Sequence, residues 1–157
     1  MKKTNKGFSM VELIIVIAIM AILAGALAPA LIKYINKSRI SADISTGNTI
    51  AGAIQTALSD EKAYDSANDS ALTDFVTYYG NQGTDMQNAL KGILGTDVCT
   101  TAAIAKSTKD VKKGSLDKTF YVVVDTSTSQ KIEVYLGDKT GAAGHMVYPT
   151  VGTDLQY

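Results

Sequence analysis

The feature that most constrains this chain is an uninterrupted apolar run near its N-terminus. Residues 13–32 read LIIVIAIMAILAGALAPALI and contain no charged side chain. In a helix, a run of this length spans about 30 Å at about 1.5 Å per residue, roughly the thickness of the hydrocarbon core of a bilayer. A helix that is apolar on every side has no face for water. The run therefore predicts a helix that is covered by lipid or by neighbouring helices.

The charges around this run indicate its orientation. Lys2, Lys3 and Lys6 are the only charged residues before Glu12. Lysines beside a membrane span favour the cytoplasmic side. We therefore expect a single-pass precursor in the cytoplasmic membrane, with its N-terminus inside and the rest of the chain exported.

Simpler interpretations of this segment fit less well. The apolar core of a secretory signal runs for about 7–15 residues and ends at small residues, whereas here the nearest such site, Ala26–Ala28, is followed by Pro29. A lipoprotein signal needs a cysteine at the end of the run, and none is there. A plain membrane anchor for an extracellular binding domain explains the length and the lysines but not Glu12.

Glu12 is the residue that calls for an explanation. A carboxylate beside a membrane span is costly unless it is paired, and such residues are functional candidates by default. A cut before Phe8 would create a free amino group at about the same membrane depth. The carboxylate of one subunit can then pair with the amine of its neighbour, which neutralises both charges in a low-dielectric setting.

These residues carry a specific resemblance. The segment KGFSMVELIIVIAIMAILAGALAPALIKYINKSR closely resembles the class III signal and N-terminal helix of type IV prepilins and the related pseudopilins. The resemblance implies that a prepilin peptidase cuts between Gly7 and Phe8 and that Phe8 becomes N-methylated. Glu12 then matches the family's acid at the fifth mature position, and Pro29 matches its helix-breaking proline. The match covers about a quarter of the chain, residues 1–40.

By this resemblance, the chain is a structural subunit of a type IV pilus and not an enzyme. Its expected partners are further copies of itself in a filament, the prepilin peptidase, an assembly ATPase and a platform protein. The cytoplasmic membrane would hold the precursor, and the cell surface would carry the filament, for adhesion, motility or DNA uptake. Two alternatives stay open, namely a pseudopilin of a type II secretion or competence system and the membrane-anchored binding domain.

Gly25 and Pro29 form a weak point in the apolar helix. Proline removes a backbone donor and clashes with the preceding turn, and glycine costs about 1 kcal/mol in a helix. One interpretation is a gentle kink in an intact span. The interpretation that the resemblance favours is a segment that melts when subunits pack and lets the filament bend and extend.

After this run the chain becomes amphipathic. Small and apolar residues recur at spacings of four and three, which places them on one helical face: Ile40, Ile44, Gly47, Ala51, Ile54 and Leu58, widened by Ile50 and Ala57. Charged and polar residues lie largely off this face: Lys33, Lys37, Arg39, Asp43 and Asn48. The pattern predicts that one helix continues to about residues 60–63.

Residues 64–118 show less order. Residues 70–79 and 85–94 are expected to form short helices, the second ended by Gly95. Residues 106–118 are lysine-rich and are expected to form a solvated loop. Five acids suggest a calcium site, but their spacing does not match an EF-hand loop, and solvated acids near a helix end are the commoner case: Asp60, Glu61, Asp65, Asp69 and Asp74.

The last forty residues carry strand signals. Residues 119–125 (TFYVVVD) and 130–136 (QKIEVYL) are β-branched and aromatic and are separated by a short polar turn, which predicts a hairpin. Residues 145–148 can add a third strand. The expected fold class is therefore α+β, with a long N-terminal helix packed against a small C-terminal antiparallel sheet.

The expected organisation has five parts. These are a removed leader (1–7), a transmembrane or filament-core half-helix (8–32), an amphipathic half-helix (33–63), a region of loops and short helices (64–118), and the sheet with its tail (119–157).

Composition excludes several other functions. The chain has 15 basic and 15 acidic residues, and removing the leader with its three lysines would leave 12 basic residues, so no basic face for nucleic acid is expected. Cys99 is the only cysteine and His145 the only histidine. A buried free thiol is therefore favoured over a reactive or intermolecular one, and a zinc or catalytic site is disfavoured. No nucleophile–base set or phosphate loop stands out, and no metal or cofactor is expected.

Overall fold

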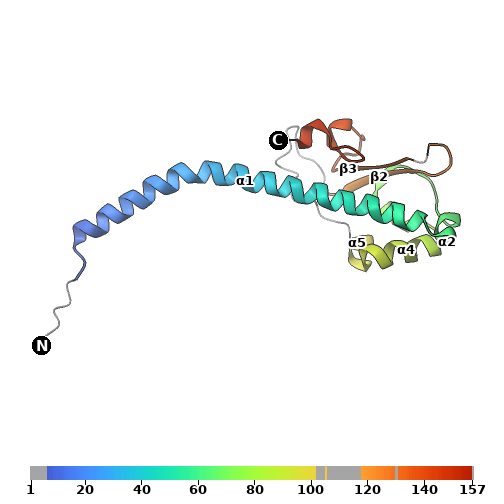
Figure 1. The fold of residues 1–157 in the computed structure, drawn as a ribbon, viewed down its shortest axis with the longest axis horizontal. Helices are drawn as coiled ribbons and strands as arrows, with labels where there is room; N and C mark the ends of the chain where they lie inside the picture. Colours follow the sequence, from blue (N-terminus) through green and yellow to red (C-terminus); the bar gives the residue numbers. More distant parts are fainter. Residues whose placement is uncertain (1–6, 102–104, 106–117, 130, 157) are drawn as a thin grey trace, which may run out of the picture. The chain divides into compact units, whose positions relative to one another are not determined.

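A computed structural model describes residues 7–101, 105, 118–129 and 131–156 of the chain. It divides into two compact units, Met1–Asn36 and Lys37–Tyr157, and each is described by itself. The expected α+β class is confirmed, because a long N-terminal helix is followed by short helices and a four-stranded antiparallel sheet (Figure 1). The expected leader lies outside the described residues except for Gly7, as does nearly all of the lysine-rich segment 106–118.

Helix α1, Met10–Leu58, is the longest element and contains Pro29. Among the described residues of the first unit, the apolar side chains of this helix are all exposed, and large ones such as Met20 and Ile22 are 64% and 73% exposed. This part of the helix has no core of its own, as an apolar run without a polar face requires.

Within the second unit, α1 has a broad buried face. Ile40, Gly47, Ala51 and Ile54 are buried as the periodicity predicts. Asp43 is also buried, at 2% exposure, so its expected place off this face was wrong. The buried arc is wider than one stripe because this part of α1 lies between the sheet on one side and two helices, α4 (Thr84–Leu94) and α5 (Thr96–Thr101), on the other (Figure 1).

The end of α1 differs from the expectation. The helix stops at Leu58, and the amides of Ser59 and Asp60 turn back to carbonyls three residues earlier. Asp60 then accepts hydrogen bonds from the amides of Lys62 and Ala63 and so caps a new helix, α2, Glu61–Asp65. An N-cap aspartate favours a helix start over helix continuation, which is why the predicted extension to residues 60–63 was wrong.

The predicted helix over residues 70–79 is half wrong. Ser70–Asp74 is strand β1, and only Phe75–Gly80 is helical, as α3. Asp74 marks the change, because its carboxylate accepts a hydrogen bond from the amide of Thr77 and caps α3. Strand β1 pairs with strand β2, Phe120–Asp125. This pairing outweighs the local preference for a helix, because the edge of β2 supplies backbone hydrogen-bond partners that lie far away in the sequence.

The next two helices cover the other side of α1. Helix α4, Thr84–Leu94, ends at Gly95 with φ 83°, which confirms both the predicted helix and its glycine cap. Helix α5, Thr96–Thr101, was not predicted. It places Cys99 in the core at 0% exposure as a free thiol, and burial raises the pKa of that thiol. The expected buried cysteine is thus confirmed.

The sheet has the order β1–β2–β3–β4 with every pair antiparallel. Its later strands are β2, Phe120–Asp125, β3, Lys131–Leu136, and β4, Met146–Tyr148. The predicted hairpin is confirmed by the β2–β3 register, in which Val122 faces Val134. Asp125 builds its turn by accepting hydrogen bonds from the amides of Ser127, Thr128 and Ser129.

The core of the second unit lies where α1 meets the sheet. Phe120, Val122, Val134 and Val147 are each at most 1% exposed and pack with the buried face of α1. Gly47 sits at the closest approach, because a Cβ atom placed there would lie 2.5 Å from Cγ1 of Val147. Two short 3-10 helices, η1, Ala143–His145, and η2, Thr153–Leu155, close the C-terminal end.

Candidate functional site

The expected cleavage point lies just before α1, outside any helix or strand. Gly7, Phe8 and Ser9 have no helical or strand structure, and Phe8 is 85% exposed. Helix α1 begins at Met10. The Gly7–Phe8 peptide bond therefore precedes the helix, in a backbone state that a protease can bind without first unwinding a helical turn.

Ser9 and Glu12 form a capping box at the start of α1. The amide of Ser9 donates to Oε2 of Glu12 over 2.9 Å, and the amide of Val11 donates to the Ser9 hydroxyl over 3.3 Å. The Ser9 carbonyl accepts the first helical hydrogen bond, from Leu13. Reciprocal bonds of this kind satisfy amides that a helix start otherwise leaves without partners.

Sequence reasoning had missed this role of Ser9, although its signal was present. A serine followed three residues later by glutamate, just before an apolar run, is the pattern of a capping box. The structure thus places Gly7, Phe8 and Ser9 directly before α1 and Glu12 in its first turn.

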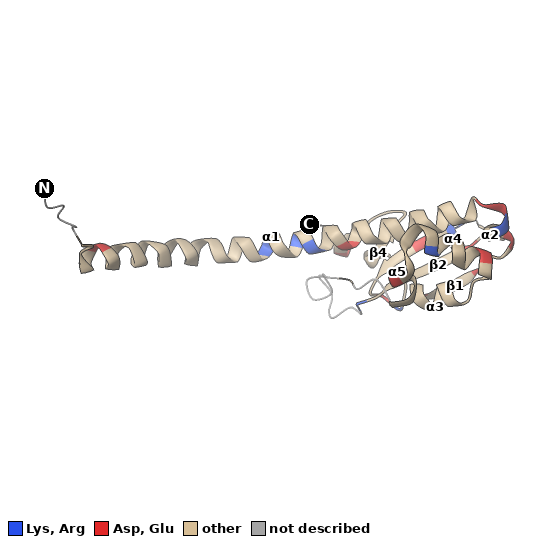
Figure 2. Ribbon diagram, turned by 90° about the horizontal axis from the view of Figure 1, so that it is seen from below, with Lys and Arg blue, Asp and Glu red and all other residues tan. Residues whose placement is uncertain are grey.

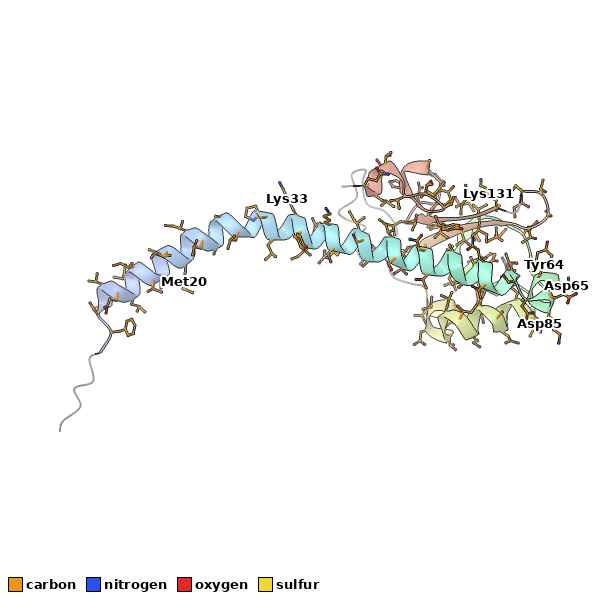
Figure 3. All side chains as sticks on the ribbon, viewed as in Figure 1. Met20, Lys33, Tyr64, Asp65, Asp85 and Lys131 are labelled. Carbon is orange, nitrogen blue, oxygen red and sulfur yellow. The ribbon has the colours of Figure 1, made fainter. Side chains whose placement is uncertain are left out.

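The first part of α1 is apolar and exposed. Figure 2 shows no charged residue on the ribbon between Glu12 and Lys33, the first lysine of the helix. Met20, labelled in Figure 3, lies on this part of α1 and is 64% exposed. By length and composition, α1 is apolar enough to cross a membrane, a test that signal sequences also pass. An apolar, uncovered half-helix fits membrane anchoring.

Gly25 and Pro29 are linked through the helical hydrogen-bond pattern. Residue 29 would donate to the carbonyl of residue 25, four residues earlier, but proline has no amide hydrogen. The carbonyl of Gly25 therefore lacks the helical partner that its neighbours have. The helix nevertheless continues through both residues. They lie about 20–25 Å along the axis from Glu12 at about 1.5 Å per residue, so they form a separate feature from the cleavage point.

Three of the five acidic residues after α1 form hydrogen bonds within the fold. Asp60 and Asp74 cap α2 and α3. Asp69 accepts hydrogen bonds from the Ser127 hydroxyl and from the hydroxyl and amide of Thr126, each over 2.6 Å, and these bonds lower the pKa of Asp69 to about 2. Among the residues that the structure describes, no group of three His, Cys, Asp or Glu side chains is placed to hold a metal.

His145 has a buried acidic partner that the sequence did not reveal. Its Nδ1 lies 2.8 Å from Oδ2 of Asp138, and its Nε2 lies 3.5 Å from Oδ2 of Asp154. Burial raises the pKa of Asp138, but hydrogen bonds from Thr140 and His145 outweigh it and lower the value to about 2. The cluster joins the turn after β3 to η1, which gives His145 a structural role.

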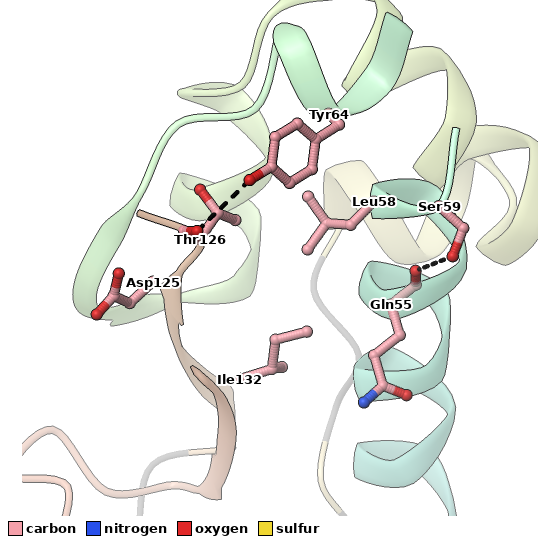
Figure 4. A pocket seen from close by; sticks show the side chains of 7 residues that line it. All are labelled: Gln55, Leu58, Ser59, Tyr64, Asp125, Thr126 and Ile132. Atoms are coloured by element: carbon pink, nitrogen blue, oxygen red, sulfur yellow. Dashed lines mark hydrogen bonds between the residues drawn. The ribbon is translucent and has the colours of Figure 1, made fainter. Parts of the chain in front are cut away.

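One cavity of about 240 Å³ opens between the end of α1 and the β2–β3 hairpin. Figure 4 shows how its polar groups bond within the fold: the Tyr64 hydroxyl donates to the carbonyl of Thr126, and the Ser59 hydroxyl donates to the carbonyl of Gln55. Small-molecule sites commonly measure about 300–1,000 Å³ and present polar groups to the ligand. We assign no ligand to this cavity, which is lined by Gln55, Leu58, Ser59, Tyr64, Asp125, Thr126 and Ile132.

Comparison with known proteins singles out the N-terminal segment. Residues 2–28 match the family model described as the prokaryotic N-terminal methylation motif. The type IV major fimbrial protein FimA of Dichelobacter nodosus is 42% identical over 65 residues, 41% of each chain. The type IV major alpha-pilin of Moraxella bovis is 46% identical over 52 residues, 31% of this chain and 33% of that protein. The fimbrial protein EcpC of Eikenella corrodens is 35% identical over 71 residues, 45% of this chain and 46% of that protein.

The extent of these matches is limited. The chain spans between 33% and 46% of the length of these three relatives. No solved structure matches it significantly. The match to the family model, residues 2–28, lies where the sequence had suggested the family. The chain thus carries the N-terminal methylation motif and is similar, over less than half of its length, to type IV pilins.

Proposed function

We propose that this protein is a structural subunit of a type IV pilus, held together in the filament by its N-terminal helix. The observation that carries the proposal is a half-helix whose apolar side chains are exposed on all sides within its own unit, joined to a second unit that has a complete core. Bundling such half-helices would remove their apolar surface from water at about 25 cal/mol per Å². The pilin and fimbrial names of the relatives favour a pilus over a secretion pseudopilus.

Processing is the first step of the proposed assembly. A prepilin peptidase would cut between Gly7 and Phe8, and Phe8 would become the N-methylated first residue. The methylation motif matched by residues 2–28 supports this step. The exposed chain around the bond, which lies outside any helix or strand, supports it too, because a scissile peptide must be free of helical structure to enter a protease site.

Pairing of Glu12 with a neighbour's new amine is the second step. In the uncleaved chain, Oε2 of Glu12 accepts the amide of Ser9. A carboxylate has two oxygens with about four acceptor positions, so the same group retains capacity for an ammonium ion. In an apolar helix bundle, an unpaired carboxylate or amine would be strongly unfavourable, and this favours the arrangement in which each subunit supplies one of each.

The remaining assignments follow from this scheme. The lysines of the leader would hold the N-terminus in the cytoplasm, and the second unit would be exported and form the filament surface. An assembly ATPase and a platform protein would extract the subunit from the cytoplasmic membrane. Gly25 and Pro29 would let the helix open locally in the bundle, because one of its hydrogen bonds is already missing there.

The direct test is N-terminal mass analysis of material sheared from cells that make the protein. The proposal expects a chain that starts at methylated Phe8 and is recovered in filaments. Glu12→Gln keeps an acceptor for Ser9 but removes the charge, and we expect it to be cleaved normally yet to give at least tenfold fewer filaments.

Glu61→Gln is the matched control, since Glu61 is an exposed acid in the first turn of α2, and it should behave as wild type. An intact Met1 in the sheared material would refute the processing step. Filaments of Glu12→Gln at the wild-type level would refute the amine–carboxylate junction.

A further inference from the structure

We propose that Ser9 is a positioning residue for Glu12, which holds the glutamate in the geometry that receives a neighbour's amine. This inference rests on the proposed function. The structure carries it through the two reciprocal hydrogen bonds of the capping box: Ser9 amide to Glu12 Oε2 over 2.9 Å, and Val11 amide to Ser9 hydroxyl over 3.3 Å.

The position of Glu12 in the helix is the first part of the argument. Counting Ser9 as the N-cap, Glu12 is the third helical residue and lies in the first turn. First turns fray readily because their amides have no helical partners. The Ser9 hydroxyl satisfies one of these amides, so it maintains the turn that carries the glutamate.

The orientation of the carboxylate is the second part. One oxygen, Oε2, is tied to the Ser9 amide, which restrains the side chain at the start of the helix, and the carboxylate keeps the capacity to accept a bond from an incoming group. The new amine would form at Phe8, next to the capping serine in the chain. In the assembled junction, the Ser9 cap of one subunit would thus hold Glu12 of the same subunit in place, while the amine would come from Phe8 of a neighbouring subunit.

The electrostatics agree with this arrangement. The N-terminus of a helix carries a partial positive charge, which favours a carboxylate in the first turn and opposes an ammonium ion nearby. Bringing an amine to this end of the bundle therefore requires an acid at a defined place. A frayed first turn would let the acid move among many positions, and ordering it again would cost conformational entropy at assembly.

The test compares two variants of the same shape. Ser9→Thr keeps a hydroxyl that can cap the helix, whereas Ser9→Val has nearly the shape of threonine but has no hydroxyl. Each full-length variant is expressed in cells that assemble wild-type filaments. We measure N-terminal cleavage by mass, filament yield after shearing, and the near-ultraviolet circular dichroism of the tyrosines as a check on the second unit.

We expect Ser9→Thr to match wild type in every measurement. Ser9→Val should be cleaved at Gly7–Phe8 and keep the tyrosine signal, but filament yield should fall roughly threefold to tenfold, the population change that loss of a typical N-cap gives. Ser45→Ala serves as a control for loss of an exposed serine elsewhere on α1 and should have no effect on yield.

Two results would overturn the inference while leaving the proposed function intact. One is an equal filament yield from Ser9→Val and Ser9→Thr. The other is a failure of Ser9→Val at cleavage, which would assign Ser9 to the peptidase instead of to Glu12. An uncleaved wild-type chain would overturn the proposed function itself, so the two failures are distinguishable.

Discussion

Gly47 offers a direct test of how α1 packs on the sheet. A methyl group at this position would lie 2.5 Å from Cγ1 and 3.1 Å from Cβ of Val147, and 3.5 Å from Cε1 of Phe120. Carbon atoms in contact normally lie about 3.5–4.0 Å apart. Gly47→Ala therefore forces either the helix or strand β4 to move.

The magnitude follows from two opposing effects. Replacing a helical glycine by alanine stabilises a helix by about 1 kcal/mol, whereas inserting a methyl group into a packed core costs about 1–3 kcal/mol. We expect Gly47→Ala to lower the free energy of unfolding by up to about 2 kcal/mol. Gly52→Ala lies in the same helix with no atom within 4 Å of the added Cβ, so it should raise that free energy by about 1 kcal/mol.

The assay is urea unfolding of the full chain in detergent micelles, followed by the near-ultraviolet circular dichroism of the tyrosines in the second unit. The quantity of interest is the difference between the two alanine variants, which we expect to be about 1–3 kcal/mol. Combining Gly47→Ala with Val147→Ala should cost less than the sum of the single changes, because the clashing methyl is removed. Equal effects of Gly47→Ala and Gly52→Ala would refute the close helix–sheet approach.

Two further predictions concern the hydrogen bonds of Asp69 and the backbone hydrogen bond that is missing at Pro29. The pKa of Asp69 is lowered from 3.8 to about 2, so its stabilising effect is fully present above about pH 4 and is lost as the pH falls through about 2. The stability difference between wild type and Asp69→Asn, measured by thermal unfolding, should therefore shrink as the pH is lowered from 5 to 2, and a constant difference would contradict the assignment. Pro29→Ala restores the amide that can bond the Gly25 carbonyl and removes a helix penalty of about 3 kcal/mol. Amide hydrogen exchange around residues 25–29 should slow markedly in micelles, and unchanged exchange would show that the proline does not weaken the helix.

Much of the N-terminal half could be predicted from the sequence because its signals are local. The length of the apolar run sets the extent of the exposed helix, and the spacing of Ile40, Gly47, Ala51 and Ile54 sets its buried face. In the C-terminal part, the β2–β3 hairpin was also predictable, because Asp125 stabilises its turn by accepting hydrogen bonds from the amides of the next few residues. The capping box at Ser9 could have been read in the same way and was overlooked.

Other features depend on contacts between distant residues. Ser70–Asp74 is a strand because β2 offers it a partner edge, with Thr73 opposite Val122. Asp43 is buried because the second unit covers α1 on two sides, although its sequence position resembles that of a solvent-exposed acid. His145 and Asp138 meet only when the chain after β3 folds back into η1.

The sequence by itself determined that this protein has an apolar N-terminal helix with Glu12 in its first turn and the expected cleavage point, Gly7–Phe8, just before it. These features could be predicted because charge, length and periodicity are properties of residues that lie close together in the chain. Only the tertiary structure decided which acids cap helices, that Ser70–Asp74 forms strand β1 and how closely α1 approaches β4. Those outcomes depend on how the helices and strands pack against one another after each has formed. The Ser9–Glu12 pair combines both situations. Its sequence pattern is local, but only the structure shows that its hydrogen bonds form directly after the Gly7–Phe8 peptide.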